Sequence, residues 1–151
     1  MSIEDRLADL GIDLPPVAKP VAAYVPAIQV GDQISTSGQL PLVSGSLPMT
    51  GLVGDQISQG DAAGQARVAA LNALAAAADV AGGVNNIRRV VRVVVYVAST
   101  ADFTAQPAVA NGASELFGEI FGDAGRHIRS AIGVAGLSLG APVKVELTVQ
   151  V

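Results

Sequence analysis

The chain has 151 residues, half of them hydrophobic and only 15% charged, a length that fits one domain spanning residues 1–151. The absence of cysteine excludes disulfides, thiolate nucleophiles and cysteine-based zinc sites. A net charge of −4 and an aromatic content of 3% argue against a general nucleic-acid binder, which needs clustered cations and stacking platforms.

The amino-terminal segment, residues 1–20, is expected to form a short helix and an extended connector. Ile3, Leu7 and Leu10 recur at helical spacing, a glycine follows, and three prolines then favour extended backbone. The polar, acidic start differs from a secretory leader, and no apolar run reaches the roughly 20 residues that cross a bilayer. We therefore expect a cytoplasmic protein with no membrane contact.

A hairpin and a loop are predicted next. Residues 21–30 have the composition of a strand, Gly31-Asp32 supplies a turn, and residues 33–37 form the partner strand. Residues 41–54 are rich in Gly, Pro and Ser and lack periodicity, which is typical of a loop.

A long helix is predicted over residues 59–81. Ser58 is its expected N-cap and Gly82-Gly83 its end. Small alanines favour close packing on a sheet. The predicted apolar stripe consists of Val68, Leu71, Leu74 and Ala78.

The rest of the chain predicts a strand, a helix and two strands. Residues 87–98 are β-branched, and a helix capped by Ser99 or Thr100 should run to Phe121, with Pro107 offsetting its start. Strands follow at 127–137 and 143–151, the second with strict alternation. The order ββαβαββ indicates an α+β fold in which both helices cover one face of a mixed sheet.

Three arginines, at 88, 89 and 92, form the densest basic run. At strand spacing Arg88 and Arg92 share one face and Arg89 points the other way. The run therefore predicts no single basic patch, and nucleic acid is not an expected partner.

An arginine and a glutamate in the last two apolar strands are the best candidates for chemistry. Arg129 could hold a carboxylate with its planar fork, or it could pair with Glu146 or contact another subunit. Glu146 could act as a general base or be one more solvated acid. A single His127 on the same face as Arg129 is more typical of a structural histidine than of a metal ligand.

Other residues give weaker signals. Ser37-Gly38 could make an anion contact or simply end a strand, and Tyr24 could close a pocket or lie at a sheet edge. No Walker loop, dinucleotide fingerprint, zincin motif or Gly-x-Ser-x-Gly elbow occurs. We therefore expect neither a metal nor a cofactor.

Four segments combine into a more specific pattern than any one of them. They are Ala23-Tyr24-Val25, Gly31-Asp32-Gln33-Ile34-Ser35-Thr36-Ser37-Gly38-Gln39-Leu40-Pro41, Arg129-Ser130-Ala131 and Val143-Lys144-Val145-Glu146-Leu147. Their ordered combination resembles the RidA/YjgF family, also labelled endoribonuclease L-PSP. The sequence looks closest to a longer branch of that family, on the basis of Asn111-Gly112-Ala113-Ser114 and Gly125-Arg126-His127.

The resemblance implies a chorismate-mutase-like (YjgF) fold and a homotrimer with three clefts between subunits. Archetypal members hydrolyse enamine/imine intermediates, such as 2-aminoacrylate and its imine tautomer, to a 2-oxo acid and ammonia. By resemblance, Arg129 binds the substrate carboxylate, Glu146 helps to place the attacking water, Tyr24 and Ser37 line the pocket, and Gly38 offers its amide. Ala131 stands where many members have cysteine, and alanine suffices there if the contact is made by the backbone carbonyl.

The leading hypothesis is therefore a cofactor-free deaminase of small carboxylated imines. The first alternative is a trimer that binds 2-oxo acids without catalysis. The second, endoribonuclease activity, rests on the family label and conflicts with the acidic charge.

Overall fold

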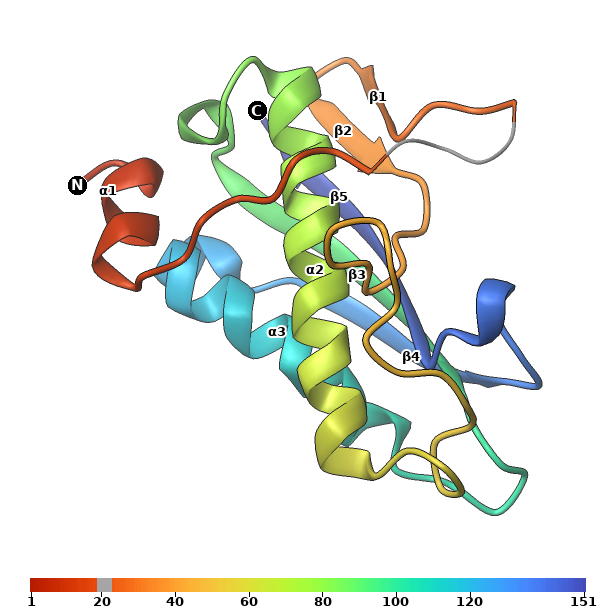
Figure 1. Ribbon diagram of the computed structural model, residues 1–151. Helices are drawn as coiled ribbons and strands as arrows, with labels where there is room; N and C mark the ends of the chain where they lie inside the picture. The colour runs from red at the N-terminus through yellow and green to blue at the C-terminus, as the bar shows by residue number, and fades with distance from the viewer. Residues whose placement is uncertain (19–22) are drawn as a thin grey trace.

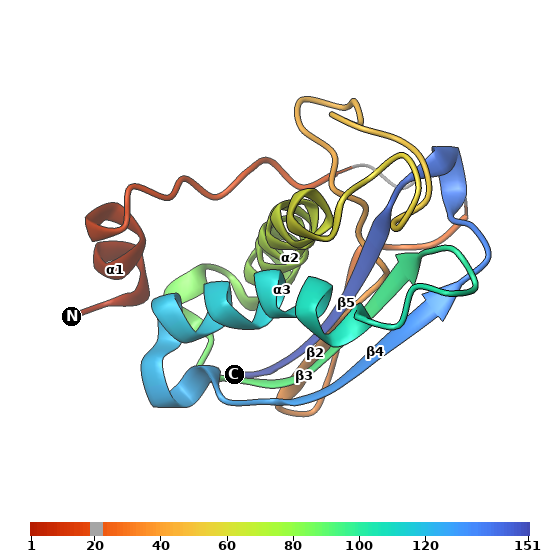
Figure 2. The same ribbon diagram turned by 90° about the horizontal axis from the view of Figure 1, so that it is seen from below.

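A computed structural model describes residues 1–18 and 23–151. Two helices lie side by side on one face of a five-stranded sheet, and a short amino-terminal helix lies beside them (Figures 1 and 2). This confirms the predicted α+β order. The elements are α1 (Ile3–Asp9), β1 (Ala27–Val30), β2 (Gln33–Thr36), α2 (Gln59–Ala81), β3 (Arg89–Ala98), α3 (Gln106–Phe121), β4 (Ile128–Val134) and β5 (Val143–Gln150), with 3-10 turns at Val84–Asn86, Gly122–Gly125 and Ser138–Gly140.

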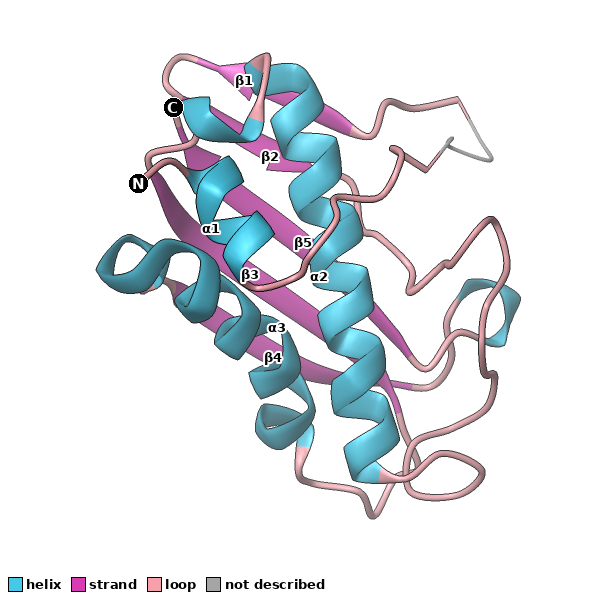
Figure 3. Ribbon diagram, turned by 60° about the vertical axis from the view of Figure 1, so that its left-hand side comes forward, coloured by secondary structure: helices cyan, strands magenta, loops and turns pink. Residues whose placement is uncertain are grey.

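The sheet has the order β1-β2-β5-β3-β4, so the last strand along the chain lies at its centre (Figure 3). β3 and β4 pair in parallel, and the other neighbours pair antiparallel. A parallel pair needs a crossover connection, and α3 supplies it. In β5 the alternate residues Val143, Val145, Leu147 and Val149 are buried under the helices.

Helix α2 begins and ends where its caps predict. The Ser58 hydroxyl accepts a hydrogen bond from the Asp61 amide at 3.1 Å, and Gly82 closes the helix with φ +80°. The predicted stripe is only partly right, because Val68 and Leu71 are half-buried whereas alanines on most sides of the helix are fully buried. Small side chains let α2 contact the sheet, α3 and the loop 41–54 at once.

Helix α3 starts later than the sequence predicts. Neither Ser99 nor Thr100 caps it; the helix begins at Gln106, and Pro107 lies in its first turn, where a missing N–H is harmless. Gly112 lets α3 approach α2 closely, since a Cβ built there would lie 1.9 Å from the backbone oxygen of Ala63.

The first strand is much shorter than predicted. The expected strand spanned residues 21–30, of which 21 and 22 fall outside the described residues, and the observed strand begins at Ala27. Pro26 cannot donate a backbone hydrogen bond to a neighbouring strand, so the segment before it bends away. Tyr24 consequently lies in a bend, with 49% of its surface exposed.

None of the helices in the described residues lies on the second face of the sheet. Residues that are cross-strand partners lie on the same face of a sheet. Thr148 of β5 lies on the second face, and its partners are Ser35 of β2 and Arg92 of β3. Ser35 in turn pairs with Ile28 and Arg92 with Ile128, so these isoleucines lie on that face too. Its edge strands expose large apolar side chains. These are Ile28 (59%), Val30 (73%), Ile128 (61%) and Ile132 (42%).

The predicted orientation of the arginine run is wrong because β3 contains a bulge. The register shifts between Val90 and Arg92, so Arg89 pairs with Gln150 and Arg92 with Thr148. Because those two β5 residues are two apart, Arg89 and Arg92 share the uncovered face. The extra residue of the bulge reverses the alternation expected from spacing.

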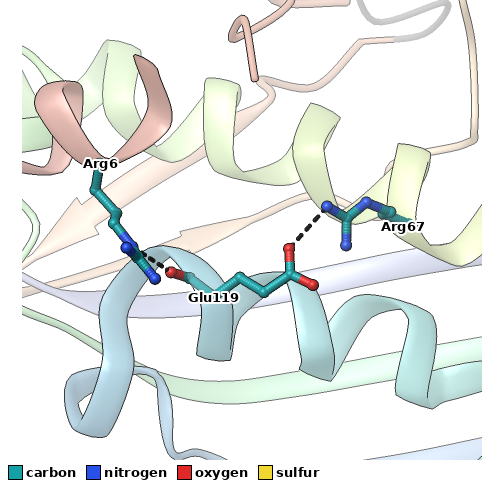
Figure 4. Close-up of polar contacts among 3 residues, drawn as sticks. All are labelled: Arg6, Arg67 and Glu119. Atoms are coloured by element: carbon teal, nitrogen blue, oxygen red, sulfur yellow. Dashed lines mark hydrogen bonds and ion pairs between the residues drawn. The ribbon is translucent and has the colours of Figure 1, made fainter. Parts of the chain in front are cut away.

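Helix α1 is fastened to the carboxyl-terminal half of α3. The Arg6 Nε donates to the backbone oxygen of Glu119 at 2.8 Å, and the Glu119 carboxylate pairs with the Arg67 Nη2 at 2.9 Å (Figure 4). The side chains of the ion pair are 41% and 44% exposed, so the pair adds little stability. Together, the two contacts of Glu119 link α1, α2 and α3 and fix the position of α1.

Candidate functional site

The two leading candidates lie on opposite faces of the sheet. Arg129 and Leu147 are both partners of Val93, on the face that the helices cover, whereas Glu146 is the partner of Val94 on the uncovered face. The alternative in which Arg129 pairs with Glu146 of the same chain is therefore wrong. A site that uses both residues needs a second copy of the chain.

Glu146 is held by a residue that the sequence reasoning missed. The Tyr96 hydroxyl donates to the Glu146 Oε1 at 3.1 Å, and both side chains are half-buried on the uncovered face. Glu146 Oε2 accepts no hydrogen bond from the described residues, which leaves it free for water. Pairing of β3 with β5 brings the two together, so only the register could have revealed Tyr96.

The Tyr96 hydroxyl should lose its proton at a higher pH than an ordinary tyrosine does. Burial raises its pKa above the usual 10.0, and the charge of Glu146 and the hydrogen bond to it add to the rise, against the opposing charge of Arg92. The chain has two tyrosines, so a Tyr24→Phe variant isolates the phenolate absorbance of Tyr96. We expect a midpoint above pH 10, and Glu146→Gln should lower it while burial keeps it raised.

The raised pKa of Tyr96 links its proton to the stability of the fold. The folded state holds the Tyr96 proton more tightly than the unfolded state does, so the contribution is complete below pH 10 and is lost as pH rises through the folded-state pKa. A Tyr96 midpoint at or below pH 10 would contradict this environment.

A bulge after β2 places Ser37 and Gly38 beside the Glu146 segment of β5. Ser35 pairs with Thr148 and Gln39 with Val145, so three residues on one strand face two on the other. The Ser37 hydroxyl donates to the Val25 backbone oxygen at 2.6 Å, which ties the bulge to the segment that carries Tyr24.

Two of the predicted pocket residues share a cavity. Tyr24 and Gly38 line a pocket of about 210 Å³ together with Lys144, a residue that the sequence reasoning did not select. A Cβ on Gly38 would lie 2.2 Å from Lys144 Cε, so glycine is what allows the lysine side chain to cross this segment. The remaining walls are mainly apolar, including Leu40, Leu42 and Leu139.

Arg129 belongs to a separate cluster on the helix side of edge strand β4. Its Nη1 donates to Asn111 Oδ1 at 2.7 Å and to Ser114 Oγ at 3.2 Å. Ser114 Oγ lies 2.9 Å from His127 Nε2, and His127 Nδ1 lies 2.6 Å from the Gly125 carbonyl oxygen. Arg129, Ser114 and His127 line a hollow of about 400 Å³.

Ala131 lies two residues further along β4, on the same face as Arg129. It is half-buried against the core, and it pairs with Val95 in the parallel register. Because β4 is an edge strand, half of its backbone groups point away from β3. A carbonyl contact from this strand thus needs no particular side chain.

Metal-binding clusters and membrane-spanning helices are both absent from the described residues. Among the described residues, no group of three or more His, Cys, Asp and Glu side chains could hold a metal ion. No helix in residues 1–18 and 23–151 is long and apolar enough to span a bilayer.

Comparisons with known proteins agree with this architecture. Residues 4–148 match the model of the family described as "YjgF/chorismate_mutase-like, putative endoribonuclease". Protein TCP17 of Trypanosoma cruzi is 40% identical over 146 residues, which cover 96% of this chain and 91% of that protein.

Two solved structures are similar along the whole fold. An endoribonuclease-family protein of Shewanella oneidensis is 32% identical, with a TM-score of 0.95 and complete coverage of both chains. The YjgF gene product of Escherichia coli is 26% identical, with a TM-score of 0.63 and coverage of 91% of this chain and 93% of that one. With the element order, the sheet topology and these matches in agreement, the chain belongs to the YjgF/chorismate mutase-like family.

Proposed function

We propose that this protein hydrolyses small carboxylated enamines and imines of the 2-aminoacrylate/2-iminopropanoate type to 2-oxo acids and ammonia. The observation that carries the proposal is the state of Glu146. One of its oxygens is fixed by Tyr96, the other accepts no hydrogen bond from the described residues, and the bulge of Ser37 and Gly38 lies beside it.

The reaction needs one activated water and one proton relay. The water oxygen forms a bond to the carbon of the protonated imine, the C=N electron pair moves to nitrogen, and Glu146 accepts a proton from the water, which gives the neutral carbinolamine. Glu146 returns that proton to the nitrogen. The C–N bond then breaks, ammonia leaves with the bonding electron pair, and Glu146 accepts the hydroxyl proton as the carbonyl forms. The products are ammonia and a 2-oxo acid. Orientation of the water and the carbon supplies much of the rate.

The carboxylate is assigned to Arg129 of a neighbouring copy. Nη1 is occupied by Asn111 and Ser114, while Nε and Nη2 donate to no described residue. A guanidinium edge with parallel N–H groups matches a carboxylate. Tyr24, Ser37 and Gly38 form the pocket side, and the Ala131 carbonyl is the backbone contact on the arginine side.

A homotrimer with clefts between subunits is part of the proposal. Apolar side chains on the uncovered face, such as Ile28 and Ile132, would be buried between copies. The same assembly would bring the uncovered face of one copy, with Glu146, toward the edge strand of the next, with Arg129.

Replacing Arg129 with alanine tests the site. We expect kcat/KM for ammonia release from imines generated in place to fall about 100-fold, mainly through KM, because a hydrogen-bonded charge contact is lost. Arg88→Ala, at an exposed arginine outside both clusters, is the control. Equal rates for the wild type and Arg129→Ala would remove the proposed carboxylate site.

Binding of 2-oxo acids without catalysis is the second candidate. The fixed guanidinium of Arg129 favours it independently, since that cluster requires no base. Saturable binding of 2-oxobutanoate with no ammonia release from any imine would select it over the deaminase.

A further inference from the structure

We propose that Ser114 and Asn111 are positioning residues that hold the Arg129 guanidinium with its Nε–Nη2 edge open to a ligand carboxylate, and that His127 orients Ser114 for this role. The inference rests on the proposed function of Arg129 as carboxylate anchor. It concerns how the anchor is built.

One edge of the Arg129 guanidinium makes no hydrogen bond to the described residues. A guanidinium has five N–H groups, two of them on Nη1. Nη1 has two acceptors, Asn111 Oδ1 at 2.7 Å and Ser114 Oγ at 3.2 Å. The three N–H groups on Nε and Nη2 donate to none of the described residues. The occupied nitrogen therefore sets the direction of the unoccupied edge.

The Gly125 carbonyl constrains how protons are arranged in the cluster. The Gly125 carbonyl oxygen can only accept, so His127 Nδ1 carries the proton. In the neutral ring Nε2 then accepts the Ser114 hydroxyl proton. With its proton committed to His127, Ser114 Oγ presents a lone pair to Arg129.

The histidine is itself held in place. Its ring meets the buried ring of Phe117 edge-on, with the centroids 6.1 Å apart and an interplanar angle of 87°. The backbone at Gly125 lies close to the backbone of Phe117, and only glycine permits this, because a Cβ at Gly125 would lie 2.3 Å from the Phe117 backbone oxygen. The chain from Phe117 and Gly125 through His127 to Ser114 is thus anchored in the core.

The hollow beside Arg129 gives a ligand room. Three glycines, at 118, 122 and 125, contribute walls without side chains, and Arg126 adds a second cation at the rim. A pre-oriented guanidinium loses less conformational entropy on binding than a mobile one. The cluster should therefore act on affinity for the carboxylate and leave the chemical step alone.

Equilibrium binding of 2-oxobutanoate, measured by calorimetry, tests the proposal without requiring turnover. Ser114→Ala and Asn111→Ala should each raise the dissociation constant about 5- to 10-fold, the factor expected for one lost hydrogen bond. Ser114→Thr keeps the hydroxyl and should restore affinity. Glu115→Gln, the exposed neighbour on α3, is the matched control and should bind as the wild type does.

The uncharged amide of the same acid separates positioning from general damage. Its affinity should be equal in all four variants, because it lacks the carboxylate. Wild-type affinity for 2-oxobutanoate in Ser114→Ala and Asn111→Ala, with loss only in Arg129→Ala, would overturn the positioning role and leave the deaminase proposal intact. A wild type that binds no 2-oxo acid would overturn both. A wild type that binds but releases no ammonia would overturn the deaminase alone.

Discussion

Replacing Glu146 with glutamine should lower kcat for imine hydrolysis by about 10²- to 10⁴-fold, the usual contribution of a positioned acid/base. Glutamine has the same shape, and its amide oxygen can still accept the Tyr96 hydrogen bond seen at 3.1 Å. The substitution therefore removes proton transfer and preserves packing. KM should change little, because the carboxylate contact belongs to Arg129.

The measurement is a steady-state assay of ammonia and 2-oxo acid release at several substrate concentrations. Glu115→Gln makes the same chemical change at an exposed helix position and should retain the wild-type rate. Tyr96→Phe should cause a smaller loss, since it frees Glu146 without removing it. An unchanged kcat in Glu146→Gln would show that water is activated by another group.

Replacing Gly112 with alanine should lower the free energy of unfolding by about 3 kcal/mol, at the upper end of typical overpacking costs. The new Cβ would lie 1.9 Å from the Ala63 backbone oxygen and 2.7 Å from its carbonyl carbon. Neither atom belongs to a flexible side chain. Helices α2 and α3 must separate, which weakens the contacts of both with the sheet.

Gly118→Ala is the matched control because it makes the same change in the same helix. Apart from its chain neighbours and its own helix backbone, no heavy atom of the described residues lies within 4 Å of a Cβ built there. Alanine is a better helix former than glycine by about 0.5–1 kcal/mol, so this variant should be more stable than the wild type. Denaturant unfolding at equal protein concentration compares the two. Equal stability of Gly112→Ala and Gly118→Ala would show that the helices can adjust without cost.

The sequence predicted helix boundaries well where the capping residues contact only nearby residues along the chain. Ser58 and Gly82 fix both ends of α2 through contacts within four residues, and the bounds predicted from sequence match the structure. The other boundaries have different causes. Pro26 lies immediately before β1, and α3 begins next to Pro107, which agrees with the offset expected from that proline. β4 spans Ile128–Val134 instead of residues 127–137, and no proline lies in that range.

The sequence could name candidate site residues but not their arrangement. Spacing along one strand says nothing of the register with the next strand, and register alone puts Arg129 and Glu146 on opposite faces. Register also brings Tyr96 to Glu146, which is 50 residues away along the chain. Ser114 and Asn111 reach Arg129 because α3 packs beside β4, across 15 and 18 residues, and spacing along the chain does not predict that packing. The predicted face of Arg89 was wrong because the extra residue of the β3 bulge inverts the alternation of side chains between the two faces of the sheet.

The central place of β5 in the sheet has a consequence for how the protein is made. β2 and β3 leave the ribosome well before β5, whose Thr148 bonds to Ser35 across a separation of 113 residues. Until β5 arrives, the β-branched strand β3 lacks one of its two sheet neighbours. Long-range pairing of this kind closes late and slowly, and unpaired strand edges are prone to aggregate. The nascent chain therefore passes through an interval of exposed strand edges that lasts until β5 pairs with β3.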